Sequence, residues 1–239
     1  MRENNNFSIG IRDGVPICLG YLSVSFAFGI FATSAGLSVL ETVLISLFNV
    51  TSAGQLAAVP IIAAAGSYIE LILSQLVINL RYALMSVSVS QKFGRTVRLR
   101  DRFPIAFVNT DEVFAVACGN ELSVGRKYML GLITTPFLGW GLGTLLGAIA
   151  GNILPAIAIS ALGIAIYGMF IAIVVPAARD SRSTALCALL SIALSCAFYY
   201  APVLREIPSG FVIIICAAAA SLLFAIVAPI EDEEVDKNA

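Results

Sequence analysis

Residues 68–90 read YIELILSQLVINLRYALMSVSVS, a mostly apolar stretch that places Gln75, Asn79 and Arg81 near its middle. A run of about 20 apolar residues can cross a bilayer as a helix, so this stretch is long enough to span. A charged side chain at the centre of such a helix costs roughly 2.5–3.5 kcal/mol on insertion scales, so its polar groups must face protein or water. The stretch therefore predicts a membrane helix that lines the inside of a bundle.

The composition of the whole chain agrees with a membrane protein. Of its 239 residues, 59% are hydrophobic and 12% are charged, whereas soluble domains have roughly 45–50% apolar and about 25% charged residues. Five further apolar stretches read as complete spans, at residues 15–33, 128–150, 156–178, 185–201 and 210–230. The composition excludes a soluble globular protein, and the net charge of -1 provides no basic surface for a nucleic acid.

Two more apolar segments are interrupted by polar residues. Segment 40–65 is split at residues 49–55, and segment 103–119 is split at residues 109–112. Both resemble broken or re-entrant helices, because irregular polar backbone at membrane depth survives only where protein or water covers it. The predicted fold is an all-α polytopic transmembrane helix bundle, with about six full spans plus two interrupted or re-entrant helical segments, in a single membrane domain over residues 1–239.

The distribution of Lys and Arg favours re-entrant segments under the positive-inside rule. If both interrupted segments return to the side from which they enter, twelve of the 14 basic residues lie on one side, one lies on the other and Arg81 lies in the membrane. If both cross fully, the eight-span alternative divides them seven to six, and seven spans with one re-entrant segment stay open. The N-terminus, 1–14, and the acidic tail, 231–239, are accordingly predicted to be cytoplasmic.

The first interruption carries candidate binding residues. Thr51 or Ser52 can cap a new half-helix that runs toward residue 65, and Gly54 allows another group to approach its backbone closely. Such a half-helix presents free N–H groups and the positive end of its dipole to an anion such as a carboxylate. Asn49, Ser52, Gly54 and Gln55 are therefore candidate substrate-binding residues. Alternatively, they only pack against a neighbouring helix.

The second interruption, Asn109-Thr110-Asp111-Glu112, supplies the acids that Arg81 needs. In an unbroken helix Arg81 lies roughly 200° around from Asn79, and an arginine at that depth requires a carboxylate partner. Either acid can be that partner. Asp111 is favoured over Glu112 for a functional role because adjacent helical positions point about 100° apart. The remaining candidate substrate-binding residues are Asn79, Arg81, Asn109, Thr110, Asp111 and Glu112. In the alternative, the pair is a structural salt bridge, and the two acids only complement the dipole of a helix that begins there.

Other features of the chain limit its chemistry. It contains no His, which removes His-containing zinc sites, His proton relays and Ser–His or Cys–His nucleophiles. Its five Cys are scattered without CxxC spacing. We expect no metal, no cofactor and no enzyme activity; an intramembrane enzyme would have to rely on Asp111 and Glu112 alone. Gly139, Gly143, Gly147 and Gly151 recur every four residues and predict a close helix contact.

At these residues the chain resembles the AzlC-like branched-chain amino acid permeases, the large subunits of two-component branched-chain amino acid exporters. The matching features are Gly10-Ile11-Arg12-Asp13-Gly14 with Pro16, the small-residue run ending in Gln55, Asn79-Leu80-Arg81-Tyr82-x-Leu84-Met85-Ser86, and Thr110-Asp111-Glu112-Val113-Phe114. They follow the family's order and cover about the first half of the chain. This sequence departs from the family pattern at Gly54 and Leu56, which flank Gln55, and at Tyr82, where the family often has His.

The resemblance implies a secondary transporter that exports leucine, isoleucine or valine from a prokaryotic cell with ion or proton coupling. It also implies the inner membrane as the location, membrane lipid as the surroundings and a small AzlD-like membrane subunit as a partner. On this reading the half-helix at residues 52–55 binds the substrate carboxylate. Asp111 binds the ammonium group or a coupling proton, and Arg81 holds Asp111 or Glu112 ionised. Transport of another small neutral solute, or a non-transporting assembly role, stays open.

Overall fold

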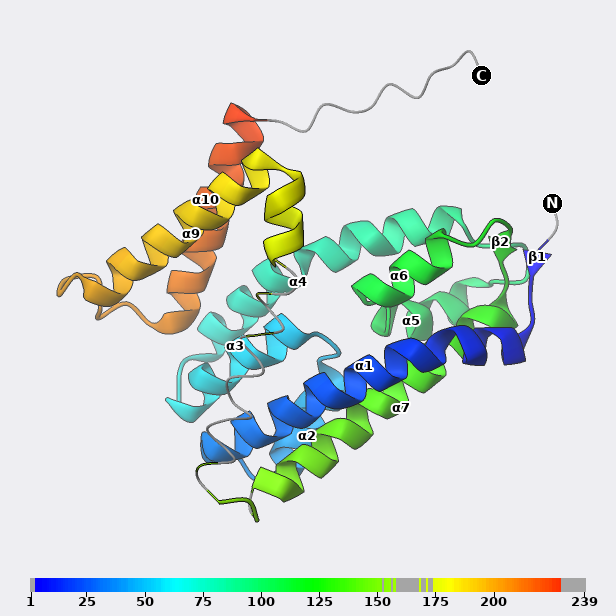
Figure 1. Cartoon of the computed structure of the whole chain (residues 1–239), viewed down its shortest axis with the longest axis horizontal. Helices are drawn as coiled ribbons and strands as arrows, with labels where there is room; N and C mark the ends of the chain where they lie inside the picture. Colours follow the sequence, from blue (N-terminus) through cyan, green and yellow to red (C-terminus); the bar gives the residue numbers. More distant parts are fainter. Residues whose placement is uncertain are drawn as a thin grey trace. The chain divides into compact units, whose positions relative to one another are not determined.

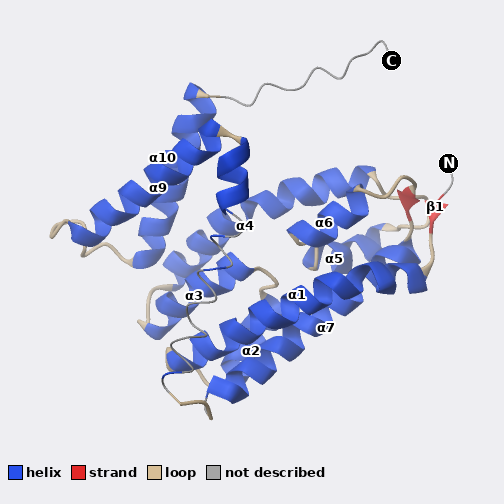
Figure 2. Cartoon of the chain, viewed as in Figure 1, coloured by secondary structure: helices blue, strands red, loops and turns tan. Residues whose placement is uncertain are grey.

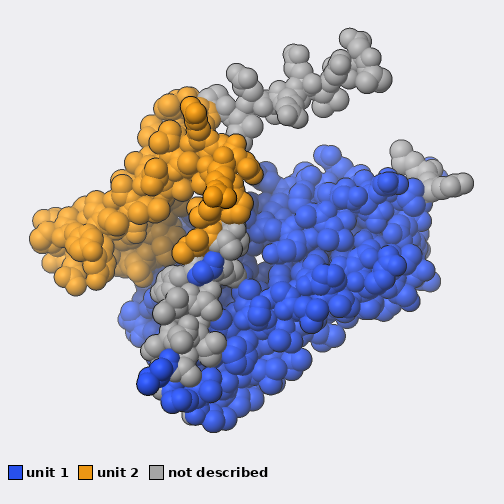
Figure 3. Space-filling model, in the orientation of Figure 1, with its two compact units in different colours: residues 1–169 blue, residues 170–239 orange. Residues whose placement is uncertain are grey.

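The computed structural model describes residues 3–151, 153–155, 157, 168, 171 and 174–228. The chain divides into two compact units, residues 1–169 and 170–239 (Figure 3), which are treated separately below. Most of the span predicted at residues 156–178 and all of the acidic tail at 231–239 lie outside the described residues. The single membrane domain over residues 1–239 therefore stays a prediction.

The described residues form helices almost throughout (Figure 2), which confirms the all-α fold class. Unit 1 contains α1 Phe7–Ser34, α2 Val39–Phe48, α3 Ser52–Ala63, α4 Tyr68–Gln91, α5 Leu99–Phe107, α6 Asp111–Cys118 and α7 Arg126–Gly151, with the short strands β1 Glu3–Asn4 and β2 Ser123–Val124. Unit 2 contains α9 Arg182–Tyr200 and α10 Ser209–Val227. Among the described helices, α1, α4, α7, α9 and α10 are long and apolar enough to cross a membrane.

Two of the sequence-based boundaries were wrong. Helix α1 begins at Phe7, not near residue 15, because the Asn6 side chain accepts hydrogen bonds from the backbone N–H of Ser8 and Ile9 and so caps the helix early. Pro16 lies inside the helix. Similarly, α5 begins at Leu99, four residues before the predicted segment, where the Asp101 carboxylate accepts from the Arg98 N–H at 3.0 Å.

The glycine stripe of α7 packs directly against α1. A Cβ added at Gly139, Gly143, Gly147 or Gly151 would meet α1 at Cys18, Leu22, Phe26 and Thr33, in that order. Because both series advance in the same direction, α1 and α7 run parallel. The stripe is therefore a helix contact, as predicted, and its partner lies in the same chain.

The N-terminal strand ties three segments together at one end of unit 1. Strand β1 pairs in parallel with β2, the Gly94 N–H donates to the Val124 carbonyl at 2.9 Å, and the Thr96 hydroxyl donates to the Glu3 carboxylate. The start of α1, the end of α4 and the start of α7 consequently lie at the same end, while α1 and α7 finish at the other (Figure 1).

This arrangement makes both broken segments re-entrant within unit 1. Helix α2 starts where α1 ends, and α3 leads back to the start of α4 at that same end (Figure 1). At the other end of unit 1, α5 starts where α4 ends. Helix α6 then leads back through β2 to this end, where α4 finishes. Residues 7–63 and 68–118 thus form two similar halves of opposite orientation, which is a common plan in secondary transporters.

Labelling of single cysteines in a cysteine-free background tests this topology. We expect Arg95→Cys and Glu121→Cys to react with an impermeant maleimide from the same side of the membrane, and Ala64→Cys from the other side. All three residues are exposed in loops. If both broken segments crossed the membrane fully, Arg95→Cys and Glu121→Cys would label from opposite sides.

The glycine contact is tested by Gly147→Leu. Its side chain would meet the backbone of Phe26, so we expect the variant to unfold at a lower temperature in detergent, with a destabilisation of about 1–3 kcal/mol. Gly20→Leu is the matched control, because a Cβ at Gly20 in α1 meets nothing within 4 Å. Equal unfolding temperatures for the two variants would contradict the contact.

Candidate functional site

The first helix break, between α2 and α3, is held by Gln75 in α4. The Gln75 Nε2 donates to the Gly54 carbonyl at 2.9 Å, and its Oε1 accepts from Asn49 Nδ2 at 3.0 Å and from Asn79 Nδ2 at 3.3 Å. Thr51 caps α3, its hydroxyl accepting from the Gly54 N–H at 3.1 Å. A Cβ at Gly54 would lie 2.7 Å from Gln75 Oε1, so the expected close approach to this glycine is made by α4.

The second break, between α5 and α6, is held by Arg81 and Ser86, also in α4. Arg81 Nη2 lies 2.7 Å from Asp111 Oδ2, and the two side chains are 55% and 47% exposed. The guanidinium carbon also lies 4.8 Å from the centre of the Tyr82 ring. Asn109 Nδ2 donates to the Ser86 hydroxyl at 3.2 Å. The sequence left both Asp111 and Glu112 open as the partner of Arg81, and the structure pairs Arg81 with Asp111.

Glu112 faces a different helix from its neighbour Asp111. The Tyr21 hydroxyl of α1 lies 2.5 Å from both Glu112 Oε2 and Thr110 Oγ1. A tyrosine has one proton to donate and an ionised carboxylate can only accept, so Tyr21 donates to Glu112 and Thr110 donates to Tyr21. The first turn of α6 thus presents one acid to α4 and the other to α1.

Both breaks lie near the middle of the membrane helices. Tyr21, Arg81 and Trp140 each stand close to the centre of α1, α4 and α7 respectively. The Trp140 ring packs edge-on against Tyr21, with 5.1 Å between centroids, and its Nε1 donates to the Ser46 carbonyl of α2 at 3.1 Å. Helices α3 and α6 therefore begin at mid-depth, so that both present the positive ends of their dipoles to the interior.

Several buried polar atoms at the breaks have no partner among the described residues. Gln55 is fully buried, and neither its Oε1 nor its Nε2 makes a hydrogen bond there. The same holds for Oδ1 of Asn79 and of Asn109. A buried polar group without a partner costs about 1–3 kcal/mol, so these atoms favour a polar ligand or water at the breaks.

The residues predicted from the sequence gather at these two breaks. Asn49, Ser52, Gly54, Gln55 and Asn79 belong to the first, and Arg81, Asn109, Thr110, Asp111 and Glu112 belong to the second. Ser52 opens α3 and makes no side-chain hydrogen bond within the described part of the chain.

The sequence reasoning missed the contacts of Tyr21 and Trp140. A signal for the two breaks themselves is present in the sequence. The same pattern occurs at both, as Phe48-x-x-Thr51-Ser52 and as Phe107-x-x-Thr110-Asp111.

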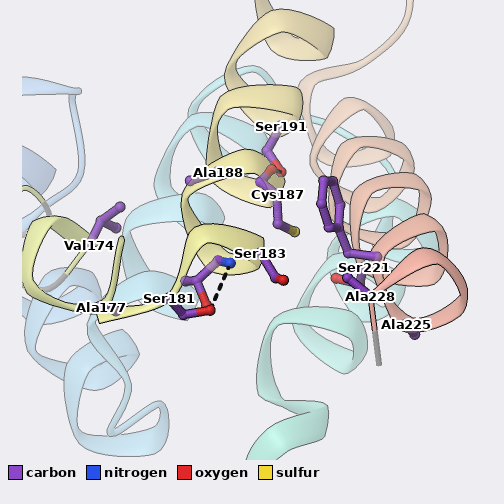
Figure 4. A pocket seen from close by; sticks show the side chains of 12 residues that line it. Val174, Ala177, Ser181, Ser183, Cys187, Ala188, Ser191, Ser221, Ala225 and Ala228 are labelled. Atoms are coloured by element: carbon purple, nitrogen blue, oxygen red, sulfur yellow. Dashed lines mark hydrogen bonds between the residues drawn. The ribbon is translucent and has the colours of Figure 1, made fainter. Parts of the chain in front are cut away.

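A groove in unit 2 is a weaker candidate (Figure 4). It has a volume of about 660 Å³ and lies between the residues around α9 and those of α10. Its lining is apolar or small, without a charged side chain. Ser181 accepts from the Thr184 N–H at 3.2 Å and Ser191 donates to the Cys187 carbonyl at 3.0 Å, so these hydroxyls are occupied within the helices. The described residues contain no group of three or more Cys, Asp or Glu that could hold a metal.

Span-length helices with two half-helices meeting at mid-depth define a polytopic α-helical membrane protein, an architecture typical of secondary transporters. The comparison with protein families agrees. The chain belongs to the AzlC family: the model described as AzlC protein matches residues 16–154, which contain both breaks. Membership is consistent with a transporter-type membrane protein. The family expected from the motifs is thereby confirmed.

The chain is also similar to individual membrane proteins. It is 29% identical over 197 residues to the inner membrane protein YgaZ of Escherichia coli, a match that covers 79% of this chain and 80% of that protein. It is 33% identical over 174 residues to an uncharacterized membrane protein of Archaeoglobus fulgidus, covering 71% and 75% of the two chains. No solved structure matches the chain significantly.

The role of Gln75 in holding the first break is tested by Gln75→Leu. The substitution leaves Asn49 Nδ2 and the Gly54 carbonyl without their partner, so we expect a destabilisation of about 1–3 kcal/mol, measured as a lower unfolding temperature in detergent. Gln91→Leu, at the exposed end of the same helix, should leave the temperature unchanged. If Gln75→Leu were equally stable, α4 would not support the break.

Proposed function

We propose that the protein is a secondary transporter that exports branched-chain amino acids across the inner membrane with ion or proton coupling. The observation that carries the proposal is the pair of half-helices α3 and α6. Both begin at mid-depth and lead back to opposite ends of unit 1, and the Arg81–Asp111 ion pair lies at the start of α6. Discontinuous helices of this kind frame the substrate site in many secondary transporters. The choice of leucine, isoleucine or valine rests on the family resemblance.

In this proposal the start of α3 binds the substrate carboxylate. Its first turn offers N–H groups and the positive dipole end, and Gln55 adds a buried amide with no partner among the described residues. The side chains of Asn49, Gln75 and Asn79 hydrogen-bond to one another at the break, while Asn79 Oδ1 has no partner among the described residues. Substrate would therefore bind without displacing the hydrogen bonds that hold α3 on α4.

Asp111 binds the substrate ammonium group, in competition with Arg81. The two side chains are about half exposed at 55% and 47%, so a ligand can reach them. A substrate that binds Asp111 releases Arg81 from α6. Asp111 therefore contacts Arg81 in the empty state and the substrate in the loaded state. Such a difference is what allows a ligand to shift a conformational equilibrium.

The proposed surroundings are membrane lipid and a small AzlD-like subunit, with both termini in the cytoplasm. The exposed apolar side chains along α4, among them Leu76, Leu80 and Leu84, are suited to lipid or to an apolar membrane partner. The subunit itself is proposed from the family resemblance.

Uptake of labelled leucine into leucine-loaded proteoliposomes tests the proposal, with the small subunit present or absent. We expect counterflow by the wild type and a loss of at least about tenfold in Asp111→Asn, because a neutral amide does not replace the charge-assisted contact. Glu121→Gln, which neutralises an exposed acid in the loop after α6, should transport like the wild type.

Folding of each variant is checked by size-exclusion chromatography before transport is scored. An absence of counterflow in folded wild type with its subunit would remove the branched-chain assignment and favour another small neutral solute. If Asp111→Asn and Arg81→Ala prevented assembly while transport per folded molecule stayed unchanged, the polar centre would serve assembly instead.

A further inference from the structure

The polar centre of the described bundle has one negative charge more than positive charge. In the middle parts of α1, α4 and α7 and at the two breaks, the charged side chains are Arg81, Asp111 and Glu112. Arg81 pairs with Asp111 at 2.7 Å. The described residues provide no salt bridge to Glu112, whose described contact is with the Tyr21 hydroxyl.

Arg81 and Tyr21, the partners of Asp111 and Glu112, differ in whether they can accept a hydrogen bond. A guanidinium is always protonated and only donates hydrogen bonds, so a proton on Asp111 would face a donor and break the ion pair. A hydroxyl both donates and accepts. Tyr21 can therefore donate to Glu112 when the acid is ionised and accept from it when the acid is protonated.

Other groups around Glu112 fit this division. Two titratable groups interact with Glu112 in the described part of the chain, Tyr21 from α1 and Asp111 on its own helix. Arg81 and Tyr82 of α4 interact with those two groups. Arg81 is engaged by Asp111 and by the Tyr82 hydroxyl at 3.1 Å. Glu112 is exposed, so water can deliver a proton, and the nearby Asn109 Oδ1, in a side chain only 3% exposed, is an acceptor without a described partner.

We propose that Glu112, held by the Tyr21 hydroxyl, carries the coupling proton, while Asp111 stays ionised for Arg81 and the substrate. This inference rests on the proposed transport function and separates two roles that the sequence assigned to Asp111. Glu112 takes one proton from a hydronium ion on one side, so that one O–H bond of the hydronium breaks as the carboxyl O–H bond forms. After the protein reorients, that carboxyl O–H bond breaks and the proton passes to a water molecule on the other side. No other bond changes, and no redox partner is needed.

Glu112→Gln distinguishes exchange from coupled transport in the complete transporter with its small subunit. The amide keeps the shape of the protonated acid and cannot release a proton. We expect leucine counterflow within about twofold of the wild type but leucine transport driven by a pH gradient reduced at least about tenfold. Glu112→Asp, which retains a carboxylate, should keep gradient-driven transport, and Glu121→Gln is the surface control.

The outcomes separate this inference from the transport proposal. Gradient-driven transport that persists in folded Glu112→Gln, or counterflow that is lost with it, would overturn the proton role while leaving wild-type transport intact. If the wild type showed no counterflow, the transport proposal itself would fail. Should Glu112→Gln not fold, Glu112→Ala is scored in the same two assays, and an internal pH dye reports whether wild-type leucine flux moves protons; an absence of proton movement also overturns the inference.

Discussion

Backbone that breaks at membrane depth must have its polar groups satisfied by protein, because lipid offers no hydrogen bonds. Helix α4 supports both breaks. At the first, Gln75 donates to the backbone carbonyl of Gly54. At the second, Ser86 and Arg81 hold the side chains of Asn109 and Asp111. The helix therefore cannot be a uniformly apolar span, although each polar residue in it costs insertion energy. These polar residues make the contacts that hold the half-helices α3 and α6 in place at the two breaks.

Much of this architecture follows from the sequence. Hydropathy located α4 and both interruptions, because an apolar stretch of about 20 residues is a local property. The requirement that an intramembrane arginine find a carboxylate narrowed the partner of Arg81 to the neighbouring acids Asp111 and Glu112. The structure was needed to choose Asp111. These inferences depend on composition and spacing along one segment or on charge balance alone.

Other features required the structure. The Tyr21–Glu112 contact joins residues 91 positions apart, and no local pattern distinguishes Tyr21 from an ordinary membrane tyrosine. The start of α1 depended on a side-chain cap at Asn6 that outweighed the polar residues after it. Gln75 was one of the polar residues of α4 expected to face protein or water, but its part in bridging Asn49 and Gly54 depends on how two helices meet.

The parallel contact between α1 and α7 also affects how the protein is made. The partner that fills the surface of α1 is α7, which begins at Arg126, so α1 emerges from the ribosome long before its main contact exists. Strand β1 must likewise wait for β2 at Ser123. Unit 1 can therefore complete its packing only after its seven helices, α1 to α7, have been synthesised, and until then the side of α1 that contacts the α7 glycines lacks this partner.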